Sequence, residues 1–419
     1  MSERYPGGEQ TVFKVDERNL QSALDSSLRL ILDHPRQIHD IDSLSDELAI
    51  LAALDRSGNA GKVESLLSEY HRLQHLNGEF RTGRREIEGT GCALWSLVDH
   101  ARLTGEINHL NSVYSYVRRG LRWIARNRCS DGSKPHSGLM PELPNRPLNR
   151  YPAALWTLAG IQEAARAASA LGKSGHLFES ESLFHELKRA LLRSLDLIAG
   201  ERNRSGLPSD PDSPPGEISA STLTALIPGE VFSPDFKHLS GTIELLFGNR
   251  DLPPAGDSSS NGLSKAERAA LAHHLLRRGD GRAWDIIESI TNTSITSVVD
   301  ASYLIWLTRN MLVYDHHSTL LIAPGYALRP PEDGSVVELI DAPTCYGPVS
   351  YRLERAGEEL RLEWMALRRQ APEYLIWPLP GVLLSSDPPT ITLTGSRKGI
   401  HLDPGGGRLK IKLVAGTLV

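Results

Sequence analysis

The sequence predicts a mainly α-helical protein, a closed (α/α)6 toroid of six helical hairpins followed by a small C-terminal antiparallel β domain. Three observations predict this fold. Apolar residues recur with a helical period in about twelve segments before residue 314. The connections between these segments alternate between long polar loops and tight turns with glycine. From about residue 320, apolar and polar residues alternate as in β-strands.

The predicted helices are marked by apolar residues three or four positions apart. Most of them end at a glycine or just before a proline, which are helix-stop signals. In order, the segments are 19–33, 43–56, 62–76, about 89–104, 107–126, 153–170, 178–199, 218–227, 236–247, 263–278, 282–292 and 298–313.

The alternation of loop lengths predicts where the functional site lies. The connections after odd-numbered helices are mostly long (34–42, 77–90, 127–150, 200–217 and 248–262, with 293–297 a short exception), and most of those after even-numbered helices are tight. In an up-down array all odd connections lie at one end, so the long loops should gather at one rim, where binding and catalysis usually occur. A plain helical solenoid is the alternative, but the regular alternation favours closure into a ring.

The C-terminal part has the two-residue period of strands. Seven short segments between 319 and 414 show it, and their charged, turn-rich character is typical of a small β-sandwich with a structural role. We therefore expect two domains, a toroid over 1–318 and a β domain over 319–419.

Composition excludes several classes of partner. The chain has 419 residues, 46 Lys and Arg, 51 Asp and Glu and a net charge of −5, which does not favour binding to nucleic acid or an anionic membrane. The first residues lack the apolar core of a signal peptide, and no apolar run is long enough to span a bilayer. Cys92, Cys129 and Cys345 are too few for a disulfide framework. We expect a reduced, cytoplasmic protein.

No metal or cofactor is expected. The pairs His273-His274 and His316-His317 are adjacent, so their side chains point apart on a helix, and no Cys/His constellation supports zinc. The chain has no glycine-rich phosphate loop with lysine and no Gly-x-Ser-x-Gly nucleophile turn.

Several stretches stand in a familiar order: DELAILAALDRSG at 46–58, EGTGCALW at 88–95, YPAALWTLAG at 151–160 and DAPTCYGPVSY at 341–351. Together they resemble the six-hairpin glycosidases, a superfamily with rhamnosidase-like and glucoamylase-like members, over about residues 46–353. The resemblance implies hydrolysis of a glycosidic bond in a soluble glycan, usually with inversion. The start of the last helix departs from the pattern, because Asp300 is its only carboxylate. A catalytically degenerate relative that binds carbohydrate or a protein partner is therefore the alternative.

Glycosidic hydrolysis needs two carboxylates, one protonated and one ionised. The resemblance and the rim position select Glu88, Glu142 and Asp300 as catalytic candidates. Glu88 precedes the predicted helix that starts at Gly89, Glu142 follows Pro141 in a long loop, and Asp300 lies at the entrance to the twelfth helix. Each has a structural alternative: a helix-start charge for Glu88, a solvated loop charge for Glu142, and an N-terminal cap for Asp300.

Five further residues are candidates for binding the substrate. Asp46 could bind a sugar hydroxyl, Phe80 and Tyr151 could stack on a sugar face, and Arg84 and Arg85 could bind an anionic sugar. The alternatives are a helix-start carboxylate for the first and plain surface charge for the arginines. The helical tryptophans lie at core spacing, so packing is the expected role for each.

Overall fold

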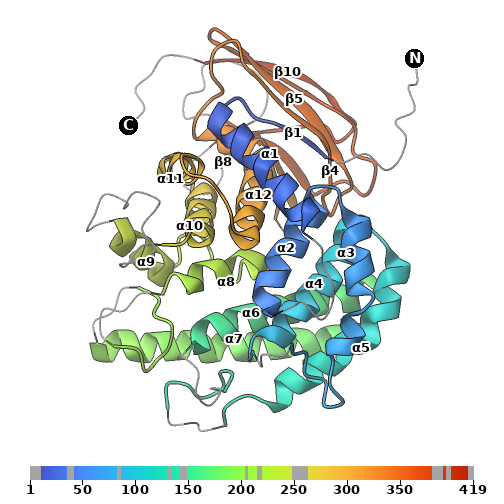
Figure 1. The fold of residues 1–419 in the computed structure, drawn as a ribbon, viewed down its shortest axis with the longest axis vertical. Helices are drawn as coiled ribbons and strands as arrows, with labels where there is room; N and C mark the ends of the chain where they lie inside the picture. The colour runs from blue at the N-terminus through green and yellow to red at the C-terminus, as the bar shows by residue number, and fades with distance from the viewer. Residues whose placement is uncertain are drawn as a thin grey trace.

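A computed structural model gives the structure of this protein. It describes residues 11–34, 42–82, 86–130, 132, 134–141, 149–202, 206–214, 219–247, 263–316, 318–379, 390–392 and 398–413. Twelve α-helices lie among these residues (Figure 1). They are α1 Arg18–Asp33, α2 Leu44–Arg56, α3 Ala60–Leu67, α4 Gly89–Thr104, α5 Ile107–Arg126, α6 Arg150–Ala170, α7 Ser174–Arg202, α8 Ser221–Gly229, α9 Lys237–Phe247, α10 Lys265–Arg278, α11 Arg282–Thr291 and α12 Val298–Leu312.

The six even-numbered helices form a closed ring. Each of α2, α4, α6, α8 and α10 packs against the next even-numbered helix, and α12 packs against α2. This last contact distinguishes a ring from an open solenoid, in which the first and last repeats do not touch. The odd-numbered α1, α5, α7 and α11 pack outside, on α12, α4, α6 and α10 respectively. The predicted (α/α)6 toroid is confirmed.

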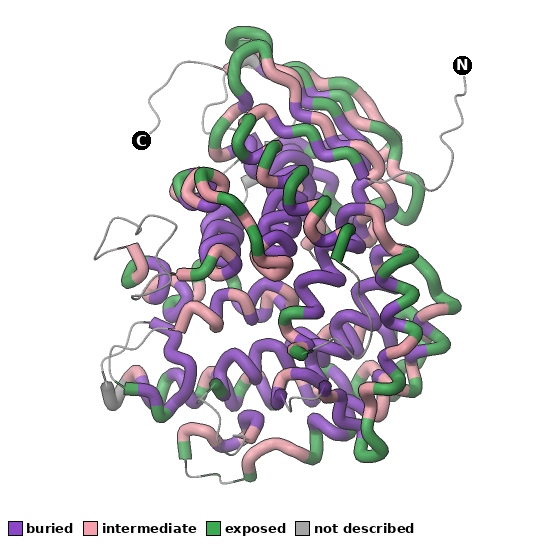
Figure 2. The backbone as a smooth tube through the Cα atoms, in the orientation of Figure 1, coloured by how far each residue is buried: buried purple, intermediate pink, exposed green. Residues whose placement is uncertain are grey.

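Burial follows from these positions. The inner helices α6 and α12 are buried over nearly their whole length, whereas α5 buries only a stripe of residues and exposes the rest (Figure 2). Because the inner helices meet neighbours on most sides, they are rich in alanine, leucine and glycine rather than amphipathic. The outer helices face water on one side, so they keep a polar face.

Two glycines set the separation of α4 and α6. A Cβ atom on Gly160 would lie 2.3 Å from the carbonyl oxygen of Gly91, and a Cβ on Gly91 would lie 2.6 Å from the Cα of Thr157. Both distances are too short for real atoms, so the two helices can pack this closely only because both positions lack a side chain.

The third helix is shorter than predicted. Instead of one helix over 62–76, α3 ends at Leu67 and a 3₁₀-helix follows at Tyr70–Leu73. The chain then reverses, since Gln74 forms an antiparallel bridge with Phe80 around Gly78, whose φ is 99°. A continued helix would run past this turn, so the apolar period alone overestimates its length.

The C-terminal strands form two five-stranded sheets in the described residues. Their orders are β1-β4-β5-β6-β10 and β2-β3-β7-β9-β8. The strands are β1 Val12–Lys14, β2 Val313–His316, β3 Thr319–Ile322, β4 Val336–Ala342, β5 Val349–Ala356, β6 Glu359–Trp364, β7 Tyr374–Pro378, β8 Thr390–Thr392, β9 Lys398–His401 and β10 Gly407–Lys412. A C-terminal β domain is thus confirmed.

Two features of these sheets differ from the sequence prediction. Strands β3 and β7 are parallel, because the chain leaves the second sheet after β3, builds β4 to β6 of the first sheet and returns in the same direction. Strand β1 comes from the N-terminal end of the chain and pairs with β4, with Phe13 opposite Leu339 (Figure 1). The division at 318/319 remains a prediction, and β1 and β2 precede it although both belong to the sheets.

A buried layer of charges joins the inner helices near their C-terminal ends. Arg56 of α2 and Arg102 of α4 both contact the Asp99 carboxylate, at 2.8 and 2.5 Å, and Arg102 lies 3.7 Å from Glu163 of α6. Burial alone would raise the pKa of Asp99, but the two guanidinium groups lower it. The layer therefore holds an ionised carboxylate inside the protein.

An ion pair and a hydrogen bond join this end of the ring to the segments of the β-sheets. Arg309 of α12 contacts Asp315 of β2 at 2.6 Å, and Arg369, which follows β6, donates to the Leu103 carbonyl at the end of α4.

No helix of the described part is both long and apolar enough to cross a membrane.

Candidate functional site

The long loops lead into the N-terminal ends of the inner helices, so these helix starts form one rim of the ring. At the rim, α2 and α4 bring three carboxylates together. Glu86, in the loop before α4, has 7% of its surface exposed, and its Oε2 accepts a hydrogen bond from the Leu44 N–H at 2.9 Å. Burial, then the charge of Glu88 and to a lesser degree that of Asp46, raises the pKa of Glu86 to about 7.

Glu88 occupies the position directly before α4. Its side chain makes no capping hydrogen bond to the helix, while its carbonyl accepts the Cys92 N–H. Glu88 therefore does not cap the helix through its side chain, and its place before α4 still fits the alternative role of a helix-start charge. The side chain is half-buried, and its charge raises the pKa of both Glu86 and Cys92 after burial, which is the larger cause for each.

Asp46 lies in the first turn of α2 and is exposed. Burial first, and then the charge of Asp46, raises the pKa of the Tyr303 hydroxyl, and that hydroxyl also hydrogen-bonds the side chain of Thr224 on α8. The rim thus combines an exposed carboxylate, a half-buried one and a buried one next to a tyrosine of α12. A carboxyl with its pKa near neutrality beside two further carboxyl groups is suited to proton transfer.

This chain is similar to known proteins in its fold and not in its sequence. No protein-family model matches the chain, and no curated protein is significantly similar in sequence. The α-L-rhamnosidase of Dictyoglumus thermophilum superposes with a TM-score of 0.66 at 12% identity, covering 96% of this chain and 50% of that one. The Streptomyces avermitilis α-L-rhamnosidase complexed with L-rhamnose gives a TM-score of 0.61 at 12% identity, covering 96% and 42%. The chain has the six-hairpin glycosidase fold.

At this identity the similarity concerns the fold alone. The chain spans half or less of the length of these two rhamnosidases. Activity and substrate must therefore be argued from the residues at the rim of the six-hairpin fold.

Asp300 has a structural partner in this fold. Its Oδ1 accepts the backbone N–H of Ala266 at 2.8 Å and so joins the start of α12 to the start of α10. The cap of α12 is Ser297, whose Oγ accepts the Asp300 N–H, so Asp300 lies in the first turn rather than at the cap. Burial raises the pKa of Asp300.

The two aromatic candidates are core residues, which corrects the expectation that they stack on a sugar. Phe80 and Tyr151 both have 0% exposed surface. The Tyr151 hydroxyl lies 2.8 Å from Ser194 Oγ of α7, and the Phe80 N–H donates to Thr90 Oγ1 of α4. Phe80 lies in the loop before α4 and Tyr151 in the first turn of α6, and both rings turn inward and are fully buried. Glu142, Arg84 and Arg85 lie outside the described residues.

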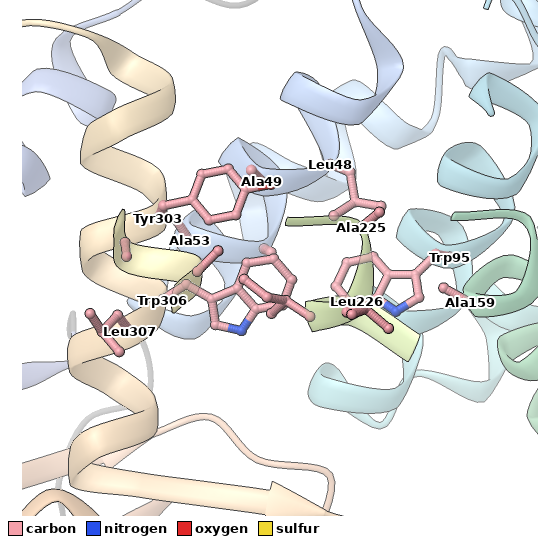
Figure 3. Close-up of a cluster of buried hydrophobic side chains, with 14 of the residues drawn as sticks. Leu48, Ala49, Ala53, Trp95, Ala159, Ala225, Leu226, Tyr303, Trp306 and Leu307 are labelled. Atoms are coloured by element: carbon pink, nitrogen blue, oxygen red, sulfur yellow. The ribbon is translucent and has the colours of Figure 1, made fainter. Parts of the chain in front are cut away.

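The ring axis below the rim is filled by apolar side chains (Figure 3). Trp95 and Trp306 have ring centroids 5.6 Å apart, and the Tyr303 ring stacks on Trp306 at 6.3 Å. The Arg56 guanidinium lies 4.9 Å from the Trp306 centroid, which places the charged layer directly beneath the aromatic one. The tryptophans have 2% and 4% exposed surface, so a ligand at the rim would rest above this layer.

The sequence pattern does not single out Glu86, which lies two residues before the candidate Glu88. Its neighbour Ile87 is buried, and a carboxylate beside a buried apolar residue in a polar loop signals an inward turn. Within the described residues, no group of three or more His, Cys, Asp or Glu side chains is arranged to hold a metal ion.

Proposed function

We propose that the protein hydrolyses a glycosidic bond of a soluble glycan at the rim of its six-hairpin fold. The observation that carries this proposal is the burial of the Glu86 carboxyl at the rim beside Glu88 and Asp46, which raises its pKa to about 7. A buried carboxyl that keeps its proton near neutral pH can donate it to the leaving oxygen, and an ionised neighbour can act on water or on the sugar. The fold shared with rhamnosidases supports a carbohydrate substrate.

In this proposal Glu86 is the general acid and Glu88 is the ionised partner that activates water, which gives inversion. Asp46, exposed in the first turn of α2, orients a sugar hydroxyl. Glu142 remains a second candidate for the acid and Asp300 a second candidate for the base. The three free cysteines support a reducing compartment such as the cytoplasm.

The test is a hydrolysis assay on a panel of aryl glycosides and oligosaccharides that includes α-L-rhamnosides. Glu86→Gln and Glu88→Gln should each lower kcat by about 10² to 10⁴-fold, the range expected for general acid or base groups. Asp300→Asn and Glu142→Gln test the second candidates. Glu363→Gln, which alters a surface pair with Arg408 on the sheet, is the matched control and should keep full activity.

Hydrolysis that survives both rim substitutions would refute this site, whichever glycan is cleaved. The stereochemistry of the product, read by NMR, separates inversion from retention. Retention would exclude Glu88 as a general base that activates water in a single displacement.

The second candidate function is carbohydrate binding without hydrolysis. It is favoured by the filled axis beneath the rim, where Trp95, Trp306 and Tyr303 leave at most 5% of each side chain exposed. Saturable binding of a glycan by calorimetry, lost in Asp46→Asn and unaccompanied by cleavage, would support binding over catalysis.

A further inference from the structure

A cavity lies outside the ring axis. It has a volume of about 450 Å³ and opens between the segment formed by α3 and the 3₁₀-helix on one side and the start of α5 on the other, with Leu97 of α4 among its lining residues. This volume is typical of sites for small molecules. None of the rim carboxylates Asp46, Glu86 and Glu88 lines it, so it is separate from the proposed hydrolytic site.

The charged residues that line this cavity are acidic. Glu64 of α3 and Glu106, which precedes α5, both line it, and no lysine or arginine does. Neither carboxylate has a hydrogen-bond or ion-pair partner among the described side chains, and Glu106 makes no capping bond to α5. Both side chains are exposed and are therefore available to a ligand.

His109 of α5 also lines the cavity. The His109 ring hydrogen-bonds the Leu97 carbonyl, and its Nε2 is buried without a partner in the described part of the chain. A ring nitrogen that bonds a carbonyl must donate, so Nδ1 carries the proton and Nε2 offers a lone pair. Burial, and then the charge of His100, lowers the pKa of His109 and favours this neutral form.

The groups behind His109 do not supply a net positive charge. The His100 ring lies 5.0 Å from the His109 ring, edge to face, and its Nδ1 lies 2.9 Å from the buried Asp55 carboxylate. Burial opposes protonation of His100, but its bond to Asp55 raises the pKa overall. Since Asp55 offsets any charge on His100, Glu64 and Glu106 set the sign of the cavity. Both carboxylates act electrostatically on His109, so the three groups share one local field.

We propose that this cavity binds a small molecule through a primary ammonium group, with the carboxylates of Glu64 and Glu106 as the acceptors. A primary ammonium has three donors, no acceptor and one positive charge, which suits a cavity lined by two carboxylates and by no lysine or arginine. Two sources share this chemistry, an amino sugar and an aliphatic amine. The proposal does not depend on glycoside hydrolysis.

The test is isothermal titration calorimetry of the full chain at pH 7.5. The probes are D-glucosamine and putrescine, and D-glucose and N-acetyl-D-glucosamine serve as uncharged matches. Saturable binding of glucosamine alone identifies an amino-sugar site, and binding of putrescine alone or of both identifies a general amine site. Either result supports the ammonium, provided that neither uncharged sugar binds comparably.

Glu64→Gln and Glu106→Gln should each weaken amine binding by about three- to tenfold, the range for the net loss of one ordinary hydrogen bond. Both residues are exposed, so the variants should fold, which circular dichroism checks. Glu363→Gln on the sheet should leave binding unchanged. The proposal fails if neither amine binds, if glucose binds as well as glucosamine, or if both cavity variants bind the amine like the unmodified protein.

Discussion

Replacing Glu86 by glutamine should change how the stability of the protein depends on pH. Glu86 is almost fully buried, and burial together with the charge of Glu88 raises its pKa from 4.5 to about 7. Glutamine has nearly the same shape and keeps an oxygen that can accept the Leu44 N–H. The substitution therefore removes the titration of this group while it preserves the local packing.

The size of the effect follows from the two pKa values. A carboxyl that holds its proton more tightly in the folded state than in the unfolded state stabilises the fold fully below the unfolded pKa of 4.5, and this contribution is lost as the pH rises through 7. At about 1.36 kcal/mol per pKa unit, the loss is about 3 kcal/mol in the free energy of unfolding. The glutamine variant lacks this loss.

The assay is chemical unfolding followed by circular dichroism at several pH values from 4.5 to 8. The unmodified protein should lose about 3 kcal/mol relative to Glu86→Gln across this range, with most of the change between pH 5 and 7. Glu363→Gln, on the surface of the sheet, should run parallel to the unmodified protein. If the stability of Glu86→Gln changed with pH in the same way as that of the unmodified protein, the pKa of Glu86 would not be raised in the folded state. Glu86 would then be unsuited to act as the general acid.

Substitutions at four further positions test the helix packing and the buried polar contacts. In Gly160→Ala the new Cβ would lie 2.3 Å from the Gly91 carbonyl oxygen, so the free energy of unfolding should fall by about 2 kcal/mol. In Gly61→Ala the new Cβ meets nothing within 4 Å, so the free energy of unfolding should rise by up to about 1 kcal/mol. Thermal unfolding that ranks the two variants the other way would contradict the close contact between α4 and α6. Asp99→Ala leaves two buried guanidinium groups without their shared carboxylate and should cost about 3 to 5 kcal/mol in urea unfolding, and a cost below about 1 kcal/mol would mean that the layer is hydrated. Asp300→Ala should cost about 1 to 2 kcal/mol and Asp300→Asn less, because asparagine keeps the acceptor, and equal costs would show that the bond to α10 is unimportant.

The ring could be predicted from the sequence because its signals are local. Helical periodicity and glycine stops such as Gly105 and Gly279, both with positive φ, mark each tight turn, and the alternation of loop lengths then fixes the rim. The pairing of β1 with β4 and the parallel pair β3–β7 depend on contacts more than three hundred and more than fifty residues apart, respectively, and no local pattern records them.

The site was predicted less completely, because burial of a loop side chain is decided by its neighbours in space. The rim position and the resemblance point to Glu88 and Asp46, but the inward turn of Glu86 depends on the start of α2, which lies 42 residues earlier. Phe80 and Tyr151 looked accessible because their loops are polar. Their rings are buried because the space between the inner and outer helices needs large apolar groups there.

The contact between α2 and α12, together with the strand pair β1–β4, has a consequence for synthesis on the ribosome. Chains emerge from the N-terminus, so β1 and α2 are made long before their partners at 336–342 and 298–312 exist. Until then the apolar flank of α2 that α12 covers stays open to water or to other chains. Contacts of such large sequence separation also slow folding. The nascent chain should therefore need protection by chaperones until its last quarter has been translated.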